Sequence, residues 1–398
     1  MQQSRSAHRV GAPEGIGRGL VVLMAVSVGM IVGNLYYIQP LLGALAREFG
    51  TTEGRVGTAA TLTQLGQALG ILLLLPIGDT QDRRKLAVAG LAASAAGLVG
   101  IAAAPGVTWL TVACLLLGLS AVSTHTLVAF GAALSRPEAR GRTVGTIMAG
   151  LLMGILLART VSGVVGAYLG WRAMFWIAAA ASAGLGVVLA YKLPADPPRP
   201  GPRYPELLAS LGRLARTQPA LREASLFGAA TFASFGAFWV ALTFHLESPT
   251  FGYGSDVVGL FGLLGAAGAL AATWAGRLAD RQDPRRLGAG SVLLTALAFA
   301  FMAPFGSTLW GLVIGTLVLD VGVQAAHIAN QARVHALIPE ARNRLHTIYM
   351  FSYFLGGSVG IALGSWGWEA AGWPGVCAVG TAIPLAAFLA TLRSRDRR

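Results

Sequence analysis

Two charged side chains fall inside long apolar stretches of this sequence. Asp320 is the only carboxylate near the middle of such a stretch, and Arg159 lies about fifteen residues into another. A charge in the hydrocarbon core of a bilayer is costly, so each group needs a partner or a task. Because burial disfavours the charged form of a carboxylate, we expect Asp320 to carry protons. Arg159 stays charged and is its expected partner, either in a switchable pair or in a static, purely structural one.

Polar residues recur at helical spacing after Asp320. Gln324, His327 and Gln331 follow at i+4, i+7 and i+11, which places all four side chains on one face of a helix. A polar face on a membrane helix must turn toward protein or water. Histidine titrates near neutrality, so His327 is a candidate proton relay, with an interfacial histidine that caps a carbonyl as the alternative.

Uncharged hydrogen-bonding side chains gather in the first two apolar stretches, and aromatic side chains form a stripe in the seventh. This pattern predicts the lining of a central cavity for a neutral or amphipathic solute. Interhelical hydrogen bonds or an interfacial aromatic belt are the alternative. The predicted cavity residues are Asn34, Tyr36, Tyr37, Gln39, Gln64, Gln67, Phe235, Trp239 and Gln324.

Membrane helices are the elements that must position these residues. Only 12% of the 398 residues are charged, and 55% are hydrophobic, against roughly 25% charged in an ordinary soluble domain. Cys114 and Cys377 lie in apolar stretches without CxxC spacing, which argues against a zinc site or a thiol redox motif. Twelve apolar runs of spanning length occur at about 18–42, 56–77, 86–104, 107–132, 144–168, 173–192, 224–246, 255–275, 287–304, 308–332, 346–367 and 373–392.

The distribution of basic residues predicts the orientation in the membrane. Of the 30 Lys and Arg residues, 26 fall in segments on the N-terminal side of the membrane, and only Arg47, Arg55 and Arg172 fall on the other side. By the positive-inside rule, both termini are expected to be cytoplasmic. The net charge of +13 is therefore explained by topology, and nucleic acid is not an expected partner.

A proline-rich segment and an internal repeat predict two halves. The segment 193–222 reads as a cytoplasmic linker between bundles at 1–192 and 223–398. A shift of 201 places Asp79 on Asp280 and Asp82 on Asp283, and a shift of 202 places His125 on His327. Parallel repeats of this kind build transporters whose site lies between the halves near the bilayer midplane.

The repeated loop is similar to a family signature. The second copy reads Gly276-Arg-Leu-Ala-Asp280-Arg281-x-x-x-Arg285-Arg286 and, with the twelve runs in a 6+6 arrangement, resembles the major facilitator superfamily. The first copy has Leu75 and Thr80 where glycine and arginine are expected. Stretches at 34–42, 141–163 and 319–331 resemble bacterial drug- and sugar-efflux members. The antiporter motif of that family, GxxxGPxxGG, is incomplete, since Gly150 and Gly154 keep its first glycines but Ile155 replaces its proline.

The resemblance implies an all-α membrane protein with twelve transmembrane helices in two six-helix pseudo-repeats. It implies a secondary active transporter with rocker-switch alternating access, most consistent with proton-coupled efflux of a small amphipathic molecule or drug. Proton-linked or facilitated uptake of a sugar or other metabolite is the alternative. The implied cytoplasmic gate consists of Asp79, Asp82, Arg83, Arg84, Gly276, Asp280, Arg281 and Arg285.

No catalytic signature accompanies these features. The sequence lacks GxSxG, HExxH and P-loop patterns, so we do not expect an enzyme or an ATP-driven pump. We expect no cofactor and no metal, with the proton gradient as the energy source. The expected partners are a small-molecule substrate, protons and the lipid bilayer. The expected form is a monomer in the bacterial inner membrane.

Overall fold

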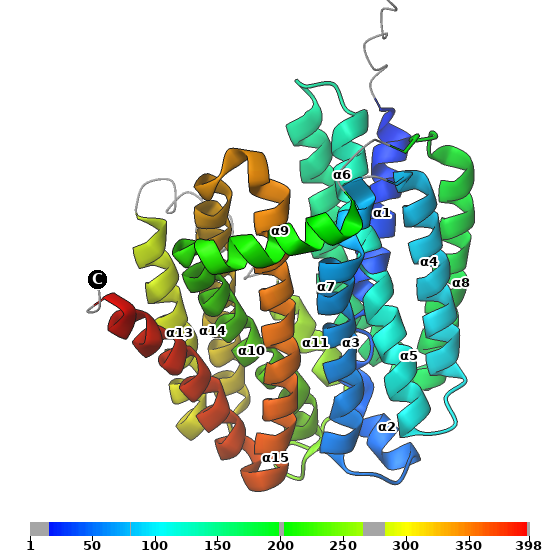
Figure 1. The fold of residues 1–398 in the computed structure, drawn as a ribbon. Helices are drawn as coiled ribbons and strands as arrows, with labels where there is room; N and C mark the ends of the chain where they lie inside the picture. Colours follow the sequence, from blue (N-terminus) through cyan, green and yellow to red (C-terminus); the bar gives the residue numbers. More distant parts are fainter. Residues whose placement is uncertain (1–15, 80, 199–202, 266–282, 396–398) are drawn as a thin grey trace, which may run out of the picture.

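The computed structural model describes residues 16–79, 81–198, 203–265 and 283–395, and all regular structure within them is helical (Figure 1). The first half of the chain forms α1 (Arg18–Asn34), η1 (Gln39–Leu41), α2 (Leu42–Glu48), α3 (Glu53–Leu73), η2 (Leu75–Asp79), α4 (Arg83–Ala102), α5 (Val107–Ser120), α6 (Ser123–Leu134), α7 (Arg140–Leu169) and α8 (Trp171–Lys192). The remainder forms α9 (Tyr204–Thr217), α10 (Pro219–Glu247), α11 (Ser255–Phe261), η3 (Gly262–Leu264), α13 (Pro284–Phe305), α14 (Leu309–Leu337), η4 (Pro339–Ala341) and α15 (Arg342–Arg395).

The helices agree with the twelve predicted spans. Ten helices among the described residues are long and apolar enough to cross a membrane. Helix α15 contains the last two spans, which are joined at a kink where Gly372 has a φ of 62° that suits glycine. The short apolar segment Ser255–Leu264 begins the predicted eighth span, and the rest of that span lies outside the described residues. The twelve-helix membrane fold is thus confirmed.

Two predicted spans are interrupted. The first span breaks after Asn34 into a turn at 35–38, and Pro40, which has no backbone N–H to donate, follows in η1. The fourth span breaks at residues 121–122 between α5 and α6. The first break turns the backbone so that Tyr36 and Gln39 leave the regular spacing of α1, and this displacement positions both side chains at the site described below.

Glycine allows α1 and α7 to pack closely. A Cβ atom added at Gly154 would lie 2.1 Å from the carbonyl oxygen of Gly29, and one added at Gly150 would lie 2.3 Å from the carbonyl oxygen of Ala25. Real Cβ atoms essentially never approach that closely, so a larger residue at either position would push the helices apart. This close packing brings the middle of α7, and with it Arg159, against the end of the first span.

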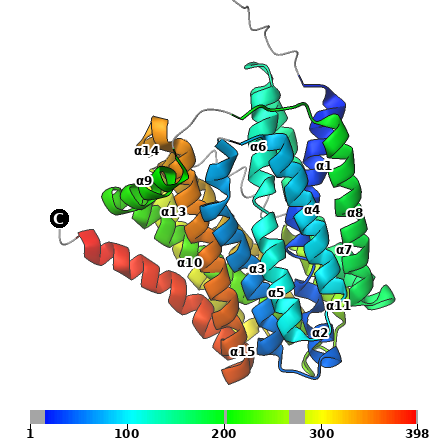
Figure 2. The same cartoon turned by 45° about the vertical axis from the view of Figure 1, so that its right-hand side comes forward.

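The linker contains an amphipathic helix. Helix α9 lies across the ends of the longer helices (Figures 1 and 2). Its Leu208, Leu211 and Leu214 belong to the same apolar cluster as Leu72 and Leu345. The hydroxyl of Tyr204 at its start donates to the carbonyl oxygen of Leu73, at 2.8 Å. Helix α9 therefore contacts residues from both halves of the chain.

The end of the molecule opposite α9 is closed by polar contacts between distant segments. Arg47 of α2 pairs with Glu247 of α10 at 2.5 Å. The backbone N–H of Gly54 in α3 donates to Glu369 of α15 at 3.0 Å, and Trp368 donates to Glu53 nearby. These contacts join α2 and α3 to α10 and α15 at that end.

Candidate functional site

A central cavity of about 1030 Å³ lies between the helices of the two halves. Its lining comes from α1, α3, α6 and α7 on one side and from α10, α14 and α15 on the other, with α9 at one end. Arg159, Asp320 and Trp239 line its deep part, while His335 and Arg344 line it near the helix ends beside α9. Because the opposite end is closed by the contacts above, the cavity faces the end of the molecule that carries α9.

Arg159 is buried in the deep part of the cavity, and only part of its guanidinium is hydrogen-bonded among the described residues. Its side chain is 3% exposed, and its Nε donates to Oε1 of Gln39 at 2.8 Å. Its Cζ lies 3.9 Å from the ring centroid of Trp239 and 4.6 Å from that of Tyr36. Its Nη2 has no hydrogen-bond partner among the described residues. A buried guanidinium with a free N–H is a ready donor for a ligand.

Asp320 lines the same cavity but does not form an ion pair with Arg159. Its side chain is 4% exposed, and its Oδ2 has no hydrogen-bond partner among the described residues. The two charges interact electrostatically, yet no N to O distance between them falls within 4.0 Å. Both residues pack near the same segment, since Cβ atoms added at Gly262 and Gly265 would lie 2.9 Å from Arg159 and 3.8 Å from Asp320, respectively. The arrangement leaves Nη2 of Arg159 as a donor and Oδ2 of Asp320 as an acceptor that a ligand could use.

The polar face of α14 and the predicted cavity residues divide into two groups. Asp320, His327 and Gln331 line the cavity, as do the predicted substrate residues Tyr36, Gln67, Phe235, Trp239 and Gln324. The remaining predicted residues, Asn34, Tyr37, Gln39 and Gln64, are buried away from its lining.

The contacts of these remaining residues are with other protein groups and not with the cavity. Asn34 donates to the hydroxyl of Ser182 in α8, at 3.1 Å. Gln39 positions Arg159, because its side-chain oxygen accepts a hydrogen bond from Nε of Arg159. The Oε1 of Gln64 has no partner among the described residues. Asn34 therefore belongs to the packing between α1 and α8.

Four histidines line the part of the cavity nearer α9, and sequence reasoning emphasised only one of them. His125 of α6 and His346 of α15 face each other with ring centroids 5.9 Å apart, and His335 lies 5.5 Å from His346. His327 is more constrained, since its two ring nitrogens lie 3.0 Å from the Tyr349 hydroxyl and 2.9 Å from Gln331. His335 follows His327 by eight residues on the same helix face, a spacing that could have identified it from the sequence. No comparable local signal marks His346.

The described residues of the predicted gate contact their own half of the chain or, in the case of Arg83, the linker. Asp82 caps α4 by accepting from the backbone N–H of Arg84 at 2.9 Å, and Asp283 caps α13 in the same way. Arg285 forms a bidentate salt bridge with Glu223 of α10, with N to O distances of 2.7 and 2.9 Å. Arg83 lies 3.9 Å from Asp196, and Arg84 donates to the carbonyl oxygen of Ala190. Gly276, Asp280, Arg281 and the side chain of Asp79 lie outside the described residues.

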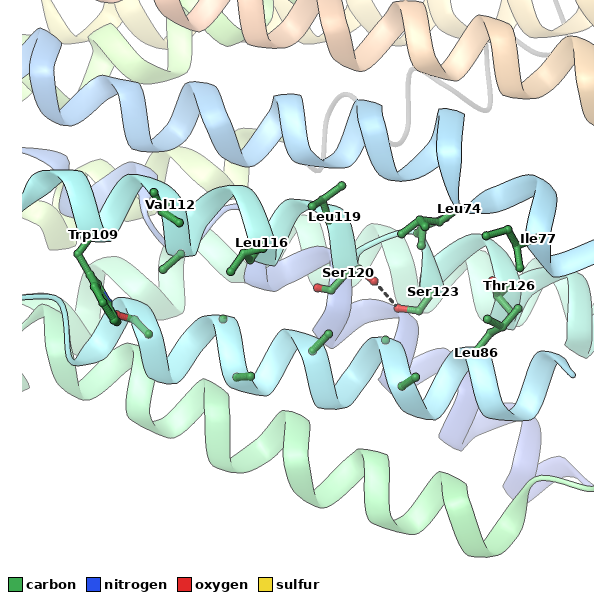
Figure 3. A pocket seen from close by; sticks show the side chains of 18 residues that line it. Leu74, Ile77, Leu86, Trp109, Val112, Leu116, Leu119, Ser120, Ser123 and Thr126 are labelled. Carbon is green, nitrogen blue, oxygen red and sulfur yellow. Dashed lines mark hydrogen bonds between the residues drawn. The ribbon is translucent and has the colours of Figure 1, made fainter. Parts of the chain in front are cut away.

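A second cavity of about 630 Å³ lies beside α4, α5 and η2. Figure 3 shows its apolar walls, with Trp109 at one end and Leu86 at the other, and the Ser123 hydroxyl bonded to the backbone oxygen of Ser120. Leu116 and Val112 are largely exposed, so the cavity opens on the outer surface of the helices. None of its described lining residues is charged, and it offers no proton-carrying group.

Comparisons with known proteins agree with this architecture. The family model described as Major Facilitator Superfamily matches residues 22–317 and 226–398. The chain is 40% identical over 379 residues to the uncharacterized transporter YgaY of Escherichia coli, covering 95% of this chain and 96% of that one. It is 29% identical to a chloramphenicol resistance protein of Streptomyces lividans, over 68% of this chain and 69% of that protein.

Solved structures share the fold at low sequence identity. The nucleoside transporter NupG aligns with a TM-score of 0.76 at 15% identity, covering 94% of this chain and 99% of that one. A bacterial homologue of the human lysosomal transporter Spinster, in an inward-facing conformation, aligns with a TM-score of 0.72 at 15% identity and covers 94% of both chains.

Proposed function

The chain belongs to the Major Facilitator Superfamily as a multi-pass membrane transporter, and from that premise we propose that it exports a small amphipathic molecule in exchange for protons. One observation carries the proposal: Asp320 and Arg159 face one closed-ended cavity and do not pair, and each has a polar atom without a hydrogen-bond partner among the described residues. A site of this kind can hold a proton or a substrate in turn.

The direction of access follows from the predicted orientation. If the basic loops are cytoplasmic, the cavity in this conformation faces the cytoplasm, where an exporter collects its substrate. The contacts of Arg47 with Glu247 and of Gly54 with Glu369 then close the outer end. Rocking of the halves 1–192 and 223–398 about the site would break these contacts and close the end beside α9.

The proton exchange follows from competition at Asp320. A substrate that donates a hydrogen bond to the carboxylate favours its charged form, so substrate binding from the cytoplasm releases the proton. After the substrate leaves on the outer side, Asp320 is reprotonated there and the empty carrier returns. Because the proton and the substrate exclude each other, the inward proton gradient drives export.

The relatives support export of small molecules. One relative is named as a chloramphenicol resistance protein, and resistance to a drug is a result that export produces. This relation is distant, and the cavity itself is what fits the proposal here: it is large enough for a drug-sized solute and mostly apolar, with few polar atoms.

Proton-linked uptake is a second candidate, favoured by the free N–H of Arg159. Protonation of Asp320 would remove a competing carboxylate from the neighbourhood of Arg159, so an anionic solute and a proton would bind together. Joint binding gives symport, which would accumulate an anion inside the cell.

The two candidates are separated by the direction of coupled movement. In everted membrane vesicles with an acidic interior, an exporter accumulates radiolabelled chloramphenicol, and collapse of the proton gradient releases it. Accumulation of chloramphenicol, or of the anion 4-nitrobenzoate, that requires an alkaline interior would contradict export and favour uptake. Asp256→Asn, on α11 and outside the cavity lining, is the matched control for Asp320→Asn.

A further inference from the structure

Positively charged side chains outnumber negatively charged ones among the described residues that line the central cavity. Among its described lining residues, Asp320 is the only carboxylate, whereas Arg159 and Arg344 are permanently charged guanidinium groups. Four histidines line the same space and carry positive or no charge. An ionised Asp320 neutralises one guanidinium at most, so the field in the cavity opposes a cationic solute.

The polar atoms without hydrogen-bond partners in the deep part of the cavity include both donors and acceptors. Nη2 of Arg159 and Nε1 of Trp239 are donors without acceptors, and Oδ2 of Asp320 and Oε1 of Gln67 are acceptors without donors among the described residues. All four side chains line the cavity and are at most 4% exposed. Buried polar atoms are normally hydrogen-bonded, so these four mark where the polar groups of a ligand belong.

The walls between these atoms are aromatic. The rings of Phe232 and Tyr353 stack with centroids 4.1 Å apart, and Phe235 stacks on Phe232 at 5.6 Å. Trp239 and Tyr36 cover two sides of the Arg159 guanidinium. A flat ring is the shape that such walls accept with favourable contact.

We propose that the substrate is an uncharged aromatic molecule that carries a planar acceptor group, such as a nitro or carbonyl group, and a hydroxyl or amide donor. The acceptor binds Arg159 and Trp239, the donor binds Asp320 and Gln67, and lipophilic cations are excluded. This inference rests on the proposed function, since the donor on Asp320 is the contact that would expel the proton.

Binding to the purified protein in lipid nanodiscs tests the inference apart from transport. Three aromatic probes separate the charges: chloramphenicol is neutral, with nitro, amide and hydroxyl groups, 4-nitrobenzoate is an anion, and tetraphenylphosphonium is a cation. Wild type is expected to bind chloramphenicol saturably and at least about tenfold more tightly than the cation. Equal or tighter binding of the cation or of the anion, or no saturable binding of chloramphenicol, would overturn the inference.

A charge-swap series locates the selectivity. Arg159→Gln leaves Asp320 as the nearest charge and is expected to tighten binding of tetraphenylphosphonium by about tenfold while weakening chloramphenicol. Arg142→Gln, on the same helix but exposed and outside the lining, is expected to change neither affinity. Unchanged cation affinity in a folded Arg159→Gln protein would overturn the charge argument. If that variant does not fold, the ratio of the chloramphenicol and tetraphenylphosphonium affinities of wild type tests the inference. Charge-selective binding without proton release would leave this inference intact and remove the proposed antiport.

Discussion

The guanidinium of Arg159 lies 3.9 Å from the ring centroid of Trp239, which places a cation of α7 against an aromatic ring of α10. These residues are far apart in the sequence and come from different halves of the chain. The stacking therefore joins the halves at the deep end of the cavity, where a substrate would also bind. A ligand that engages both residues is positioned to affect how the halves move against each other.

Trp239→Phe is expected to weaken substrate binding with little effect on folding. The substitution keeps an aromatic ring over Arg159 but removes the Nε1 donor, a hydrogen bond worth about 1 kcal/mol, or roughly fivefold in Kd. Titration of chloramphenicol into each protein measures the change. Trp109→Phe, in the second cavity, serves as the control and is expected to bind as wild type does. An unchanged Kd in Trp239→Phe would remove this donor from the site.

Asn34→Ala is expected to affect stability and to leave affinity unchanged. The Asn34 amide donates to Ser182 at 3.1 Å, away from the cavity lining, so its loss costs about 1 kcal/mol of folding free energy. Thermal unfolding followed together with ligand titration separates the two effects. A large loss of affinity with an unchanged melting temperature would show that Asn34 contacts substrate.

Glu247→Gln is expected to shift the population toward the outward-open state. Glu247 is 8% exposed and pairs with Arg47 at 2.5 Å, so removal of its charge weakens the closure of the outer end by about 1–3 kcal/mol. Labelling of a cysteine introduced near the outer end should become faster. Glu138→Gln, exposed near the start of α7, controls for the loss of charge alone. No change in labelling rate would mean that other contacts hold that end closed.

His346→Arg is expected to hold the end beside α9 open. The longer, permanently charged side chain would crowd His125 of α6, whose ring already lies 5.9 Å from that of His346, and would be repelled by Arg344 on its own helix. Spin labels at positions 136 and 340 report the separation, which should stay long. His346→Gln supplies the neutral comparison. A normal distribution of distances in His346→Arg would show that neither the size nor the charge of the side chain at position 346 limits closure of this end.

Gly154→Ala is expected to destabilise the protein by about 1–3 kcal/mol. The added Cβ would lie 2.1 Å from the carbonyl oxygen of Gly29. The nearest atoms all belong to the Gly29 backbone, which cannot move without moving α1. Gly184→Ala, where nothing lies within 4 Å of the added atom, provides the matched comparison. Denaturation of the two variants in detergent measures the difference, and equal stability would refute the close packing of α1 and α7.

Properties that depend on local sequence were predictable. The apolar runs predicted the twelve-helix fold because a spanning helix needs only an uninterrupted stretch of about 20 apolar residues. The polar face from Asp320 to Gln331 follows from helical spacing alone, and the structure places that face along the cavity. The proline-rich stretch predicted the linker, although it did not show that the linker contains a helix of 14 residues at Tyr204–Thr217.

Properties that depend on tertiary contact were not predictable. Asn34, the last residue of α1, donates to Ser182 of α8, whereas Tyr36, in the break that follows, lines the cavity; which of the two directions faces the cavity depends on how α1 packs. His125 of α6 meets His346 of α15 across the cavity, and neither residue gives a local signal of this contact. The stacking of Arg159 on Trp239 likewise depends on how the two halves meet.

Proton release on ligand binding, measured with a pH-sensitive dye in weakly buffered detergent solution, tests the central claim most directly. Chloramphenicol added to wild type is expected to release protons in a saturable manner, with the same release in Asp256→Asn and none in Asp320→Asn, while all three proteins bind the ligand. Proton release from Asp320→Asn equal to that of wild type, or ligand binding to wild type without any release, would contradict the exchange of proton and substrate at Asp320.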